Sequence, residues 1–396
     1  MPPRTGSAGG ANQPGESLSI RRIRLRGFRN LVPQEVEIGD GITLLWGPNG
    51  AGKTNLLEAL CAALTGRSFR TRSEREMIGF DDRLARVEAV VASGPEAREF
   101  LWSLGRHGER RHLVDGKAVT REHLADRPPL AIFLPDRLAL VKGPPGLRRA
   151  HLDRLAAALW PARAEARRRY GRALAQRNAL LGQIKGGGGS LDSLEAWDRE
   201  LALAGAELIA CRREAIAVLE PEFAAAAADL GLPGAATLRY RPRSDTADAD
   251  QLRSQLAERQ AADVQRGHTG HGPHLDELAV LLNERSLRLY GSQGEQRTAL
   301  LALLFAERRA LLEARRTPPL MLLDDVMSEL DAACRVLLAR RLAEGGGQAV
   351  ITATEPDHLP AGFDCAEMAV RDGEAIPVAS PNGRLPGEPA STAVGA

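Results

Sequence analysis

Hydrophobic and polar residues alternate near the start of the chain and then give way to an apolar run. The alternation over Ser19–Leu25 and Val36–Ile38 is typical of half-buried strands, and the run Ile42–Trp46 is typical of a strand buried on both faces. A glycine-rich segment follows, and leucines at helical spacing then predict a helix from Lys53 to Leu64. The pattern therefore predicts a strand, a glycine loop and a helix in succession.

The next hundred residues predict more strands. Arg86–Val91, Glu99–Leu104 and Leu130–Leu134 are short and rich in apolar residues, and Asp115-Gly116 is typical of a hairpin turn. From about residue 146 the pattern changes. Residues 147–184 and 191–230 have apolar spacings of three and four, and the linker Gly186–Ser190 separates them, so we expect an antiparallel pair of long helices.

Strand patterns return after residue 261. Leu278–Leu282 and Ser286–Leu289 predict a hairpin, and a helix is expected from Gln293 to about Leu312. Two further buried strands are predicted at Leu320–Leu323 and Ala349–Thr352. The fold class is therefore α/β, with a strand-rich core that a helical insertion interrupts.

This organisation divides the chain into five predicted segments. They are a disordered tail at 1–17, a first half of the core at 18–145, a helical arm at 146–262, a second half of the core at 263–375, and a second disordered tail at 376–396.

Composition excludes some classes of protein. The net charge of +2 gives no global basic field, so any nucleic-acid surface must be a local patch. No apolar stretch has the roughly 18 residues that a membrane helix needs, and the first residues do not resemble a signal peptide. The four cysteines form no CxxC pair and fall in or near apolar runs, which favours buried, reduced thiols and a cytoplasmic location.

The glycine loop matches the complete phosphate-binding pattern GxxxxGK[ST]. Its residues, all predicted to contact ATP, are Gly47, Pro48, Asn49, Gly50, Ala51, Gly52, Lys53 and Thr54. Glycines let backbone N–H groups approach the phosphates, and the next helix presents its positive end to the anion. Lys53 is expected to reach the β- and γ-phosphate oxygens as a catalytic charge, and Thr54 to bind Mg²⁺.

Two carboxylates end the predicted strand Leu320–Leu323. Asp324 is placed to hold Mg²⁺ opposite Thr54, and Asp325 is the candidate catalytic group that orients or deprotonates the attacking water.

A second phosphate-binding end is predicted at Ser292, Gly294 and Glu295, where a small polar loop opens a helix. One chain cannot easily bring both helix ends to the same γ-phosphate, whereas two chains in head-to-tail apposition can.

These motifs occur in the order found in ABC-type ATPases, namely Walker A, a signature loop, Walker B and a D-loop at Ser328–Asp331. Shorter motifs make the chain similar to the RecF family over about residues 18–375. They are Gly27–Asn30, Gly66–Thr71, Gly143-Pro144, Arg148–Asp153, Gln176–Asn178 and His271–His274.

The resemblance implies an ATP-binding α/β core with an inserted arm. It also implies a homodimer that forms with ATP, in which Ser292 and Gly294 contact the nucleotide of the other subunit. By the same resemblance, the protein would bind double-stranded DNA near single-stranded gaps in recombinational repair and replication restart. RecO and RecR are the implied partners, RecA loading the implied outcome, and weak DNA-dependent ATP hydrolysis the implied activity.

Several positions depart from the ABC transporter pattern. No glutamine occurs between Gln34 and Gln176, so Asp136 is the candidate for the missing Q-loop residue that contacts the nucleotide. Asp325 stands where the usual base is glutamate, Glu295 stands where many relatives carry glutamine, and no switch histidine follows Thr352. We expect slow hydrolysis that acts as a switch. The alternatives are a transporter subunit, which would carry the missing Gln and His, and an SMC-like head, which would carry a far longer arm.

Two basic stretches are candidates for DNA binding. The arginines considered are Arg67, Arg70, Arg148, Arg149, Arg167, Arg168 and Arg172. Without interleaved aromatic residues they predict phosphate contact rather than base recognition, and the alternative is a solvated helix face or loop. His268, His271 and His274, spaced by three, could hold a metal, but a loop near the nucleotide is the favoured interpretation.

Overall fold

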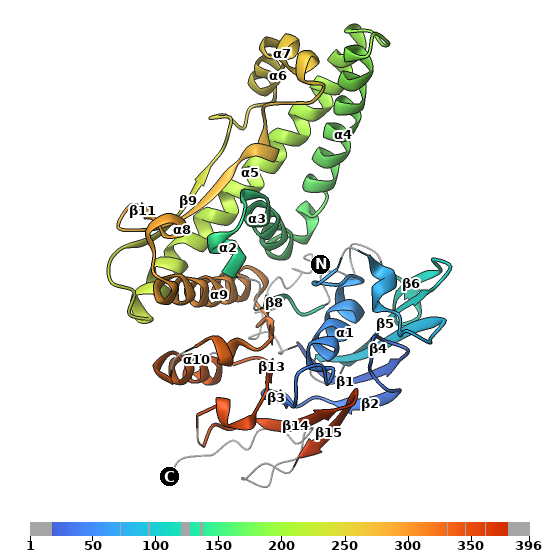
Figure 1. The fold of residues 1–396 in the computed structure, drawn as a ribbon, viewed down its shortest axis with the longest axis vertical. Coiled ribbons are helices and arrows are strands. Elements are labelled where there is room, and N and C mark those ends of the chain that lie inside the picture. Colours follow the sequence, from blue (N-terminus) through green and yellow to red (C-terminus); the bar gives the residue numbers. More distant parts are fainter. Residues whose placement is uncertain are drawn as a thin grey trace, which may run out of the picture.

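The computed structural model describes residues 18–71, 73–93, 96–119, 127–134, 138–330, 332–344, 346–360 and 362–378. Two sheets and the helices that cover them form the lower part of the molecule, and an arm of helices projects above them (Figure 1). The predicted tails at 1–17 and 379–396 lie outside the described residues. In the described part of the chain, no helix combines the length and apolarity needed to cross a membrane.

The first sheet is antiparallel, with the strand order β2-β1-β4-β5-β6-β7. Its strands are β1 (Leu18–Arg26), β2 (Gln34–Glu37), β4 (Leu84–Ser93), β5 (Glu96–Gly105), β6 (Arg110–Val114) and β7 (Lys117–Ala118). Alternation along the end of β1 places Ile23 and Leu25 in the core and leaves Arg24 and Arg26 exposed.

The second sheet carries the nucleotide motifs. Its order is β15-β14-β3-β13-β12-β8, parallel except for the pairing of β15. The strands are β3 (Ile42–Trp46), β8 (Leu130–Phe133), β12 (Leu320–Leu323), β13 (Ala349–Ala353), β14 (Ala366–Arg371) and β15 (Glu374–Val378). Since β3, β12 and β13 run in the same direction, the segments that follow them meet at one edge.

Helix α1 (Lys53–Thr65) lies between the two sheets. Leu56, Leu57 and Leu60 pack in one core cluster with Ile23 of the first sheet and Leu322 of the second. The two sheets also meet through a buried side chain, because Gln348 bonds both backbone groups of Ile20 and the carbonyl of Gly39 at 2.7 to 2.8 Å. The core is therefore a single packed body around α1.

A second lobe packs on the other face of the parallel sheet and carries the predicted signature loop. Helix α9 (Gln293–Arg315) crosses it beside α10 (Ala332–Glu344), and a small antiparallel sheet has the order β11-β10-β9. The remaining elements are α2 (Leu138–Lys142), α3 (Pro145–Leu159), β9 (Ala236–Arg241), β10 (Glu277–Leu282), β11 (Arg285–Ser286) and α8 (Leu287–Tyr290).

The arm consists mainly of α4 (Ala166–Lys185) and α5 (Asp192–Asp229), which pack against each other, with α6 (Ala249–Glu258) and α7 (Gln260–Arg266) at its end (Figure 1). Short 3-10 turns complete the fold at Glu74–Met77, Pro161–Arg163, Pro273–Leu275, Val326–Glu329 and Pro356–His358.

Most predicted elements are confirmed, and four predictions need correction. The helix expected at 147–184 is two helices, because Pro161 cannot continue a helix and the chain turns between α3 and α4. The strand expected at Ser286–Leu289 is largely α8. Strand β9 falls inside the segment predicted to be helical. Residues 376–378 belong to β15 rather than to a tail, since Ile376 pairs with Ala369.

Candidate nucleotide-binding site

At two positions of the glycine loop, the backbone has a conformation that only glycine tolerates. Gly47 has φ +156°, and a Cβ there would lie 2.1 Å from the carbonyl oxygen of Val370. Gly52 has φ +115°, and a Cβ there would lie 2.9 Å from a methyl of Leu31. Gly52 is also the N-cap of α1 and provides no side-chain cap, so the helix begins with N–H groups that are open to an anion.

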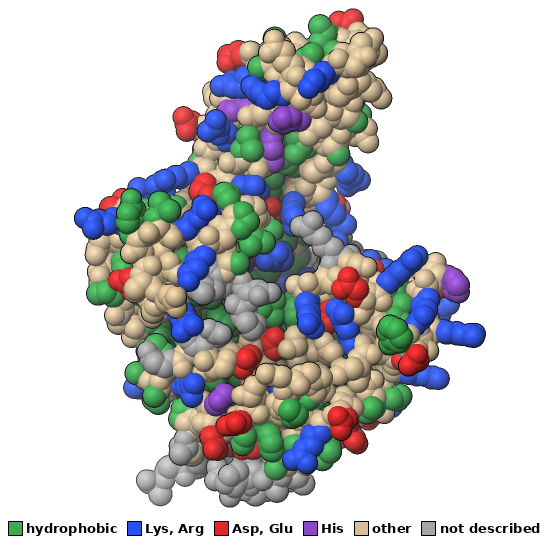
Figure 2. Space-filling model, viewed as in Figure 1, with side chains coloured by type: hydrophobic (Ala, Val, Ile, Leu, Met, Phe, Trp, Pro, Cys, Tyr) green, Lys and Arg blue, Asp and Glu red, His purple; other side chains and the backbone are tan. Residues whose placement is uncertain are grey.

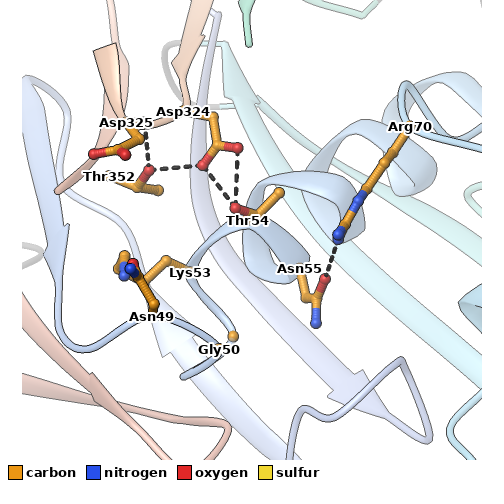
Figure 3. A pocket seen from close by; sticks show the side chains of 10 residues that line it. Asn49, Gly50, Lys53, Thr54, Asn55, Arg70, Asp324, Asp325 and Thr352 are labelled. Carbon is orange, nitrogen blue, oxygen red and sulfur yellow. Dashed lines mark hydrogen bonds between the residues drawn. The ribbon is translucent and has the colours of Figure 1, made fainter. Parts of the chain in front are cut away.

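A pocket lies between this loop and the carboxylates that follow β12 (Figure 3). It is lined by Asn49, Gly50, Gly52, Lys53, Thr54, Asn55, Arg70, Asp324, Asp325 and Thr352. The residues of the Walker A and Walker B motifs thus come together, although about 270 positions of sequence separate them. Of these lining residues, the sequence analysis did not anticipate Asn55 or Thr352.

Lys53 is buried at the floor of the loop. Its Nζ donates hydrogen bonds to the carbonyl oxygens of Gly47 at 2.6 Å and Pro48 at 2.9 Å. Burial lowers the pKa of the Lys53 ammonium, and the charges of Asp325 and Asp324 partly oppose this shift. The ammonium is thereby held within the loop that would surround the phosphates.

Asp324 accepts hydrogen bonds from two threonines. The Thr54 hydroxyl lies 2.8 and 2.9 Å from its two oxygens, and the Thr352 hydroxyl donates to Oδ1 at 2.7 Å. Burial raises the pKa of the Asp324 carboxyl, while these two hydrogen bonds lower it. A buried carboxylate beside a threonine hydroxyl is a set of hard oxygen ligands, which fits Mg²⁺.

Asp325 comes next in the chain and has an unusual backbone. Its φ is +46°, in the left-handed region, and its N–H donates to Thr352 Oγ1 at 2.9 Å. Asp325 lines the pocket (Figure 3), and its Oδ1 is buried without a hydrogen-bond partner among the described residues. Such an acceptor needs a polar partner, and a water held against the nucleotide would provide one.

Arg70 lies at the rim of the pocket, where its Nη1 donates to Asn55 Oδ1 at 3.2 Å. The loop that carries Arg70 is held by Glu58. This carboxylate is fully buried and pairs with Arg29 at 2.9 Å through both of its oxygens. Glu58 also accepts a bond from Ser68, whose hydroxyl accepts the N–H of Arg70. The motifs Gly27–Asn30 and Gly66–Thr71 therefore meet at one buried carboxylate. Arg70 was a DNA candidate, and the structure places it beside the nucleotide pocket.

The predicted signature loop lies elsewhere on the molecule. Ser292 caps α9 in a capping box, in which its Oγ accepts the Glu295 N–H at 3.2 Å and its N–H donates to Glu295 Oε2 at 2.7 Å. These hydrogen bonds lower the pKa of the Glu295 carboxyl. Ser292 and Gly294 are exposed, nothing lies within 4 Å of a Cβ built on Gly294, and none of the three residues lines the pocket.

Gln296 holds this loop in place and was missed by the sequence analysis. The side chain is buried, and its Nε2 donates to the carbonyls of Leu287 at 2.8 Å and Gly291 at 3.0 Å. The D-loop is held in a similar way, since Arg335 Nε donates to the carbonyls of Met327 and Leu330. Asp136, the proposed Q-loop substitute, lies outside the described residues.

The arginines predicted to bind DNA differ in their environments. Arg148 is 5% exposed, pairs with Glu277 at 2.7 Å and bonds two backbone carbonyls, so a DNA contact is not compatible with its position. Arg149 is partly buried and donates to the Asp276 carbonyl. Arg167, Arg168, Arg172 and Arg67 are exposed. Glu165 and Asp153 pair with the three arm residues, which reduces the basic field expected from the sequence.

Two of the three histidines, His271 and His274, are held by hydrogen bonds within the arm. In the described ranges no group of three or more His, Cys, Asp or Glu side chains is arranged to hold a metal. His274 bonds Tyr170 of α4 at 2.7 Å, and His271 bonds Ser244 and Gln255. Burial lowers the pKa of both imidazoles. The loop therefore packs in the arm, and the prediction that it lies near the nucleotide pocket is wrong for the single chain.

Comparison with known proteins identifies the family. Residues 19–374 match the model of the RecF/RecN/SMC N terminal domain. The chain is 38% identical over 351 residues to a DNA replication and repair protein RecF from Myxococcus xanthus, covering 85% of this chain and 91% of that protein. A RecF protein from Streptomyces avermitilis is 36% identical, over 90% of this chain and 99% of its own length. The chain belongs to the RecF family.

Solved structures agree with this assignment. The fold matches a RecF–ATP structure, described as a recombination mediator protein in the RecFOR pathway, with TM-score 0.84 and 28% identity over 94% of this chain and all of that one. It also matches an SMC head bound to the C-terminal winged-helix domain of ScpA, with TM-score 0.54 and 17% identity over 91% of this chain and 96% of that one. The latter likeness shows the shared ATPase-head fold. The RecF family thus belongs among the ABC- and SMC-like ATPases, and its members are DNA replication and repair proteins.

Proposed function

We propose that this protein is an ATP-dependent DNA clamp of recombinational repair. ATP with Mg²⁺ closes two copies head to tail, the dimer holds double-stranded DNA near a single-stranded gap, and slow hydrolysis releases it. The observation that carries the proposal is the separation of two phosphate-binding ends within one chain. The Walker A pocket forms without the capped, exposed loop at Ser292, which lies outside it.

The pocket supports the binding half of this cycle. Backbone N–H groups at the start of α1 and the Lys53 ammonium would bind the phosphates, and Thr54 with Asp324 would hold Mg²⁺. When bound, Mg²⁺ offsets phosphate charge during transfer. RecF relatives have been solved as RecF–ATP and RecF–ATPrS structures, which supports ATP as the ligand.

The exposed half of the site supports dimerisation. Ser292 and Gly294 open α9 without covering side chains, so a second copy could bring its nucleotide against this helix end. We propose that both residues contact ATP in trans.

Hydrolysis would rest on Asp325. Asp325 lines the pocket, and its carboxylate is suited to orient a water and accept its proton. An aspartate has a shorter reach than glutamate, and the residue directly after β13 is Thr354 rather than a switch histidine, so turnover would be slow.

The arm is the proposed DNA surface, through exposed Arg167, Arg168 and Arg172, together with Arg67 on the core. Their carboxylate neighbours leave a modest local field, which suits contact with backbone phosphates rather than recognition of bases. RecR and RecO are proposed as partners because the similar solved protein is described as part of the RecFOR pathway. RecA loading is the proposed outcome of that assembly.

Sedimentation of the purified protein tests the proposal. ATP–Mg²⁺ should convert monomer to dimer, and only the dimer should sediment with a gapped duplex. Lys53→Ala should remain monomeric in all conditions. If ATP bound to the wild-type protein without dimerisation and DNA was ignored, the clamp mechanism would be wrong.

A further inference from the structure

An exposed aromatic side chain stands next to the signature loop. All Phe, Tyr and Trp residues of the chain lie in the described ranges, and only two of them are exposed, Phe80 at 94% and Tyr290 at 73%. Tyr290 is the last residue of α8 and precedes Ser292 by two positions. Its neighbour Leu289 is 70% exposed. Hydrophobic and Lys/Arg side chains gather on the part of the face that α8 and β11 occupy (Figure 2).

The backbone that carries Tyr290 is held firmly. Leu287 of the same short helix is buried in the core of the second lobe. Gln296 donates hydrogen bonds to the carbonyl of Leu287, which precedes Tyr290 by three positions, and to the carbonyl of Gly291, which follows it. At Gly291 a Cβ would meet Leu287 Cδ2 at 2.6 Å, so this turn is tight. Tyr290 therefore presents an exposed aromatic ring on a firmly held backbone, which is an arrangement suited to contact with another molecule.

Among the described residues, the nucleotide pocket has no aromatic side chain that could stack on the base of a nucleotide. None of its lining residues is aromatic, and most are polar or charged. The pocket therefore offers groups for phosphates and Mg²⁺ but no ring to stack against a base. Two residues span at most about 7 Å, so a ring at Tyr290 stays within the length of the same ATP molecule when Ser292 is near its phosphates.

We propose that Tyr290 stacks on the base of the nucleotide bound to the second copy of the chain. The inference rests on the proposed head-to-tail dimer and deepens it, because each subunit then supplies both the phosphate contact and the base contact for its partner's nucleotide. Stacking on a base depends on ring area, so purines are favoured over pyrimidines.

The test compares dimerisation with the β,γ-imido analogues of ATP and CTP by analytical ultracentrifugation. The wild-type dimer should be about tenfold tighter with the ATP analogue, by the size of a base-stacking contact. Tyr290→Ala should lose about tenfold with the ATP analogue and little with the CTP analogue. Tyr290→Phe should behave like wild type, and Leu289→Ala, an exposed neighbour, serves as the control.

The outcomes are distinguishable. If Tyr290→Ala weakened the dimer equally with both analogues, the ring would contact protein rather than base, and the inference would be overturned. An unchanged dimer with both analogues would also overturn it. If the wild-type protein bound the ATP analogue and stayed monomeric, the proposed clamp itself would fail, independently of Tyr290. Binding of a fluorescent ATP to the monomer should be equal in all variants.

Discussion

Arg29 and Glu58 form a two-point ion pair that supports the loop of Arg70, with both N···O distances at 2.9 Å and the Glu58 side chain fully buried. Removal of one partner leaves a buried charge without its counterion, which costs about 3–5 kcal/mol. Arg29→Ala should therefore lower the free energy of unfolding by about that amount in urea titration. Arg22→Ala, which breaks an exposed pair with Glu35, should cost at most about 1 kcal/mol. Equal effects of the two substitutions would contradict the role of Glu58.

The burial of Asp324 predicts opposite pH effects on stability and on Mg²⁺ binding. Its raised pKa means that the folded, nucleotide-free protein keeps a proton that the unfolded chain releases near pH 4. The contribution of Asp324 to the free energy of unfolding should be fully present below that pH. It should be lost as the pH rises through the pKa of Asp324 in the folded protein. Mg²⁺–ATP affinity should increase over the same range, since Mg²⁺ binds the carboxylate.

Calorimetry across this pH range checks both effects. Asp324→Asn should remove both pH dependences, abolish Mg²⁺-dependent ATP binding and leave the fold intact. A pH-independent affinity in the wild-type protein would argue against Asp324 as a ligand.

Asp325→Asn should preserve ATP binding and trap the dimer. The amide cannot accept the proton of the attacking water, so turnover should fall by about 10²- to 10⁴-fold. Asp357→Asn, at an exposed position after β13, should turn over like wild type. Turnover is measured as phosphate release with DNA present. Equal activity of the two variants would show that Asp325 is not the catalytic group.

Ser292→Arg should spare ATP binding to the monomer and prevent dimerisation. The long side chain would occupy the open space at the start of α9, and the lost cap should cost only about 1 kcal/mol of stability. Ser254→Arg, at an exposed position on α6, is the matched control and should dimerise normally. Normal ATP-driven dimerisation of Ser292→Arg in ultracentrifugation would rule out the in-trans contact.

Substitution of Arg148 should affect the stability of the fold, whereas substitution of Arg172 should affect DNA binding. Arg148→Ala leaves Glu277 and two backbone carbonyls without their donor, so it should destabilise the fold by several kcal/mol. Arg172→Ala should leave stability unchanged and reduce the salt slope of duplex binding by about one, because its side chain is 74% exposed. A DNA affinity and salt slope unaffected by Arg172→Ala would remove this residue from the proposed surface.

The sequence predicted the central residues of the site because each of them belongs to a short, contiguous motif. Lys53 and Thr54 sit in a contiguous loop between a strand and a helix, and Asp324 ends an apolar strand. Parallel pairing of β3, β13 and β12 then brings them together, as an α/β fold requires.

What the sequence did not predict depends on contacts between distant segments. Thr352 acts on Asp324 only because β13 lies beside β12, and an isolated threonine at a strand end gives no signal of this. Arg148 was counted as a surface charge because its partner, Glu277, is 129 positions away. The same limit hid β9, whose pairing with β10 overrides its position between helices.

Helix α5 connects the outer arm to the signature lobe without interruption. Its 38 residues span about 57 Å. Leu201 and Leu208 pack against α4, and Leu219 and Phe223 share a core with Leu300 and Leu304 of α9. The helix can therefore act as a lever. A tilt of about 5° would displace its far end by about 5 Å, and the packed end would press on α9, the helix that Ser292 caps. Mechanical load on the arm would in this way reach the loop proposed to close the dimer.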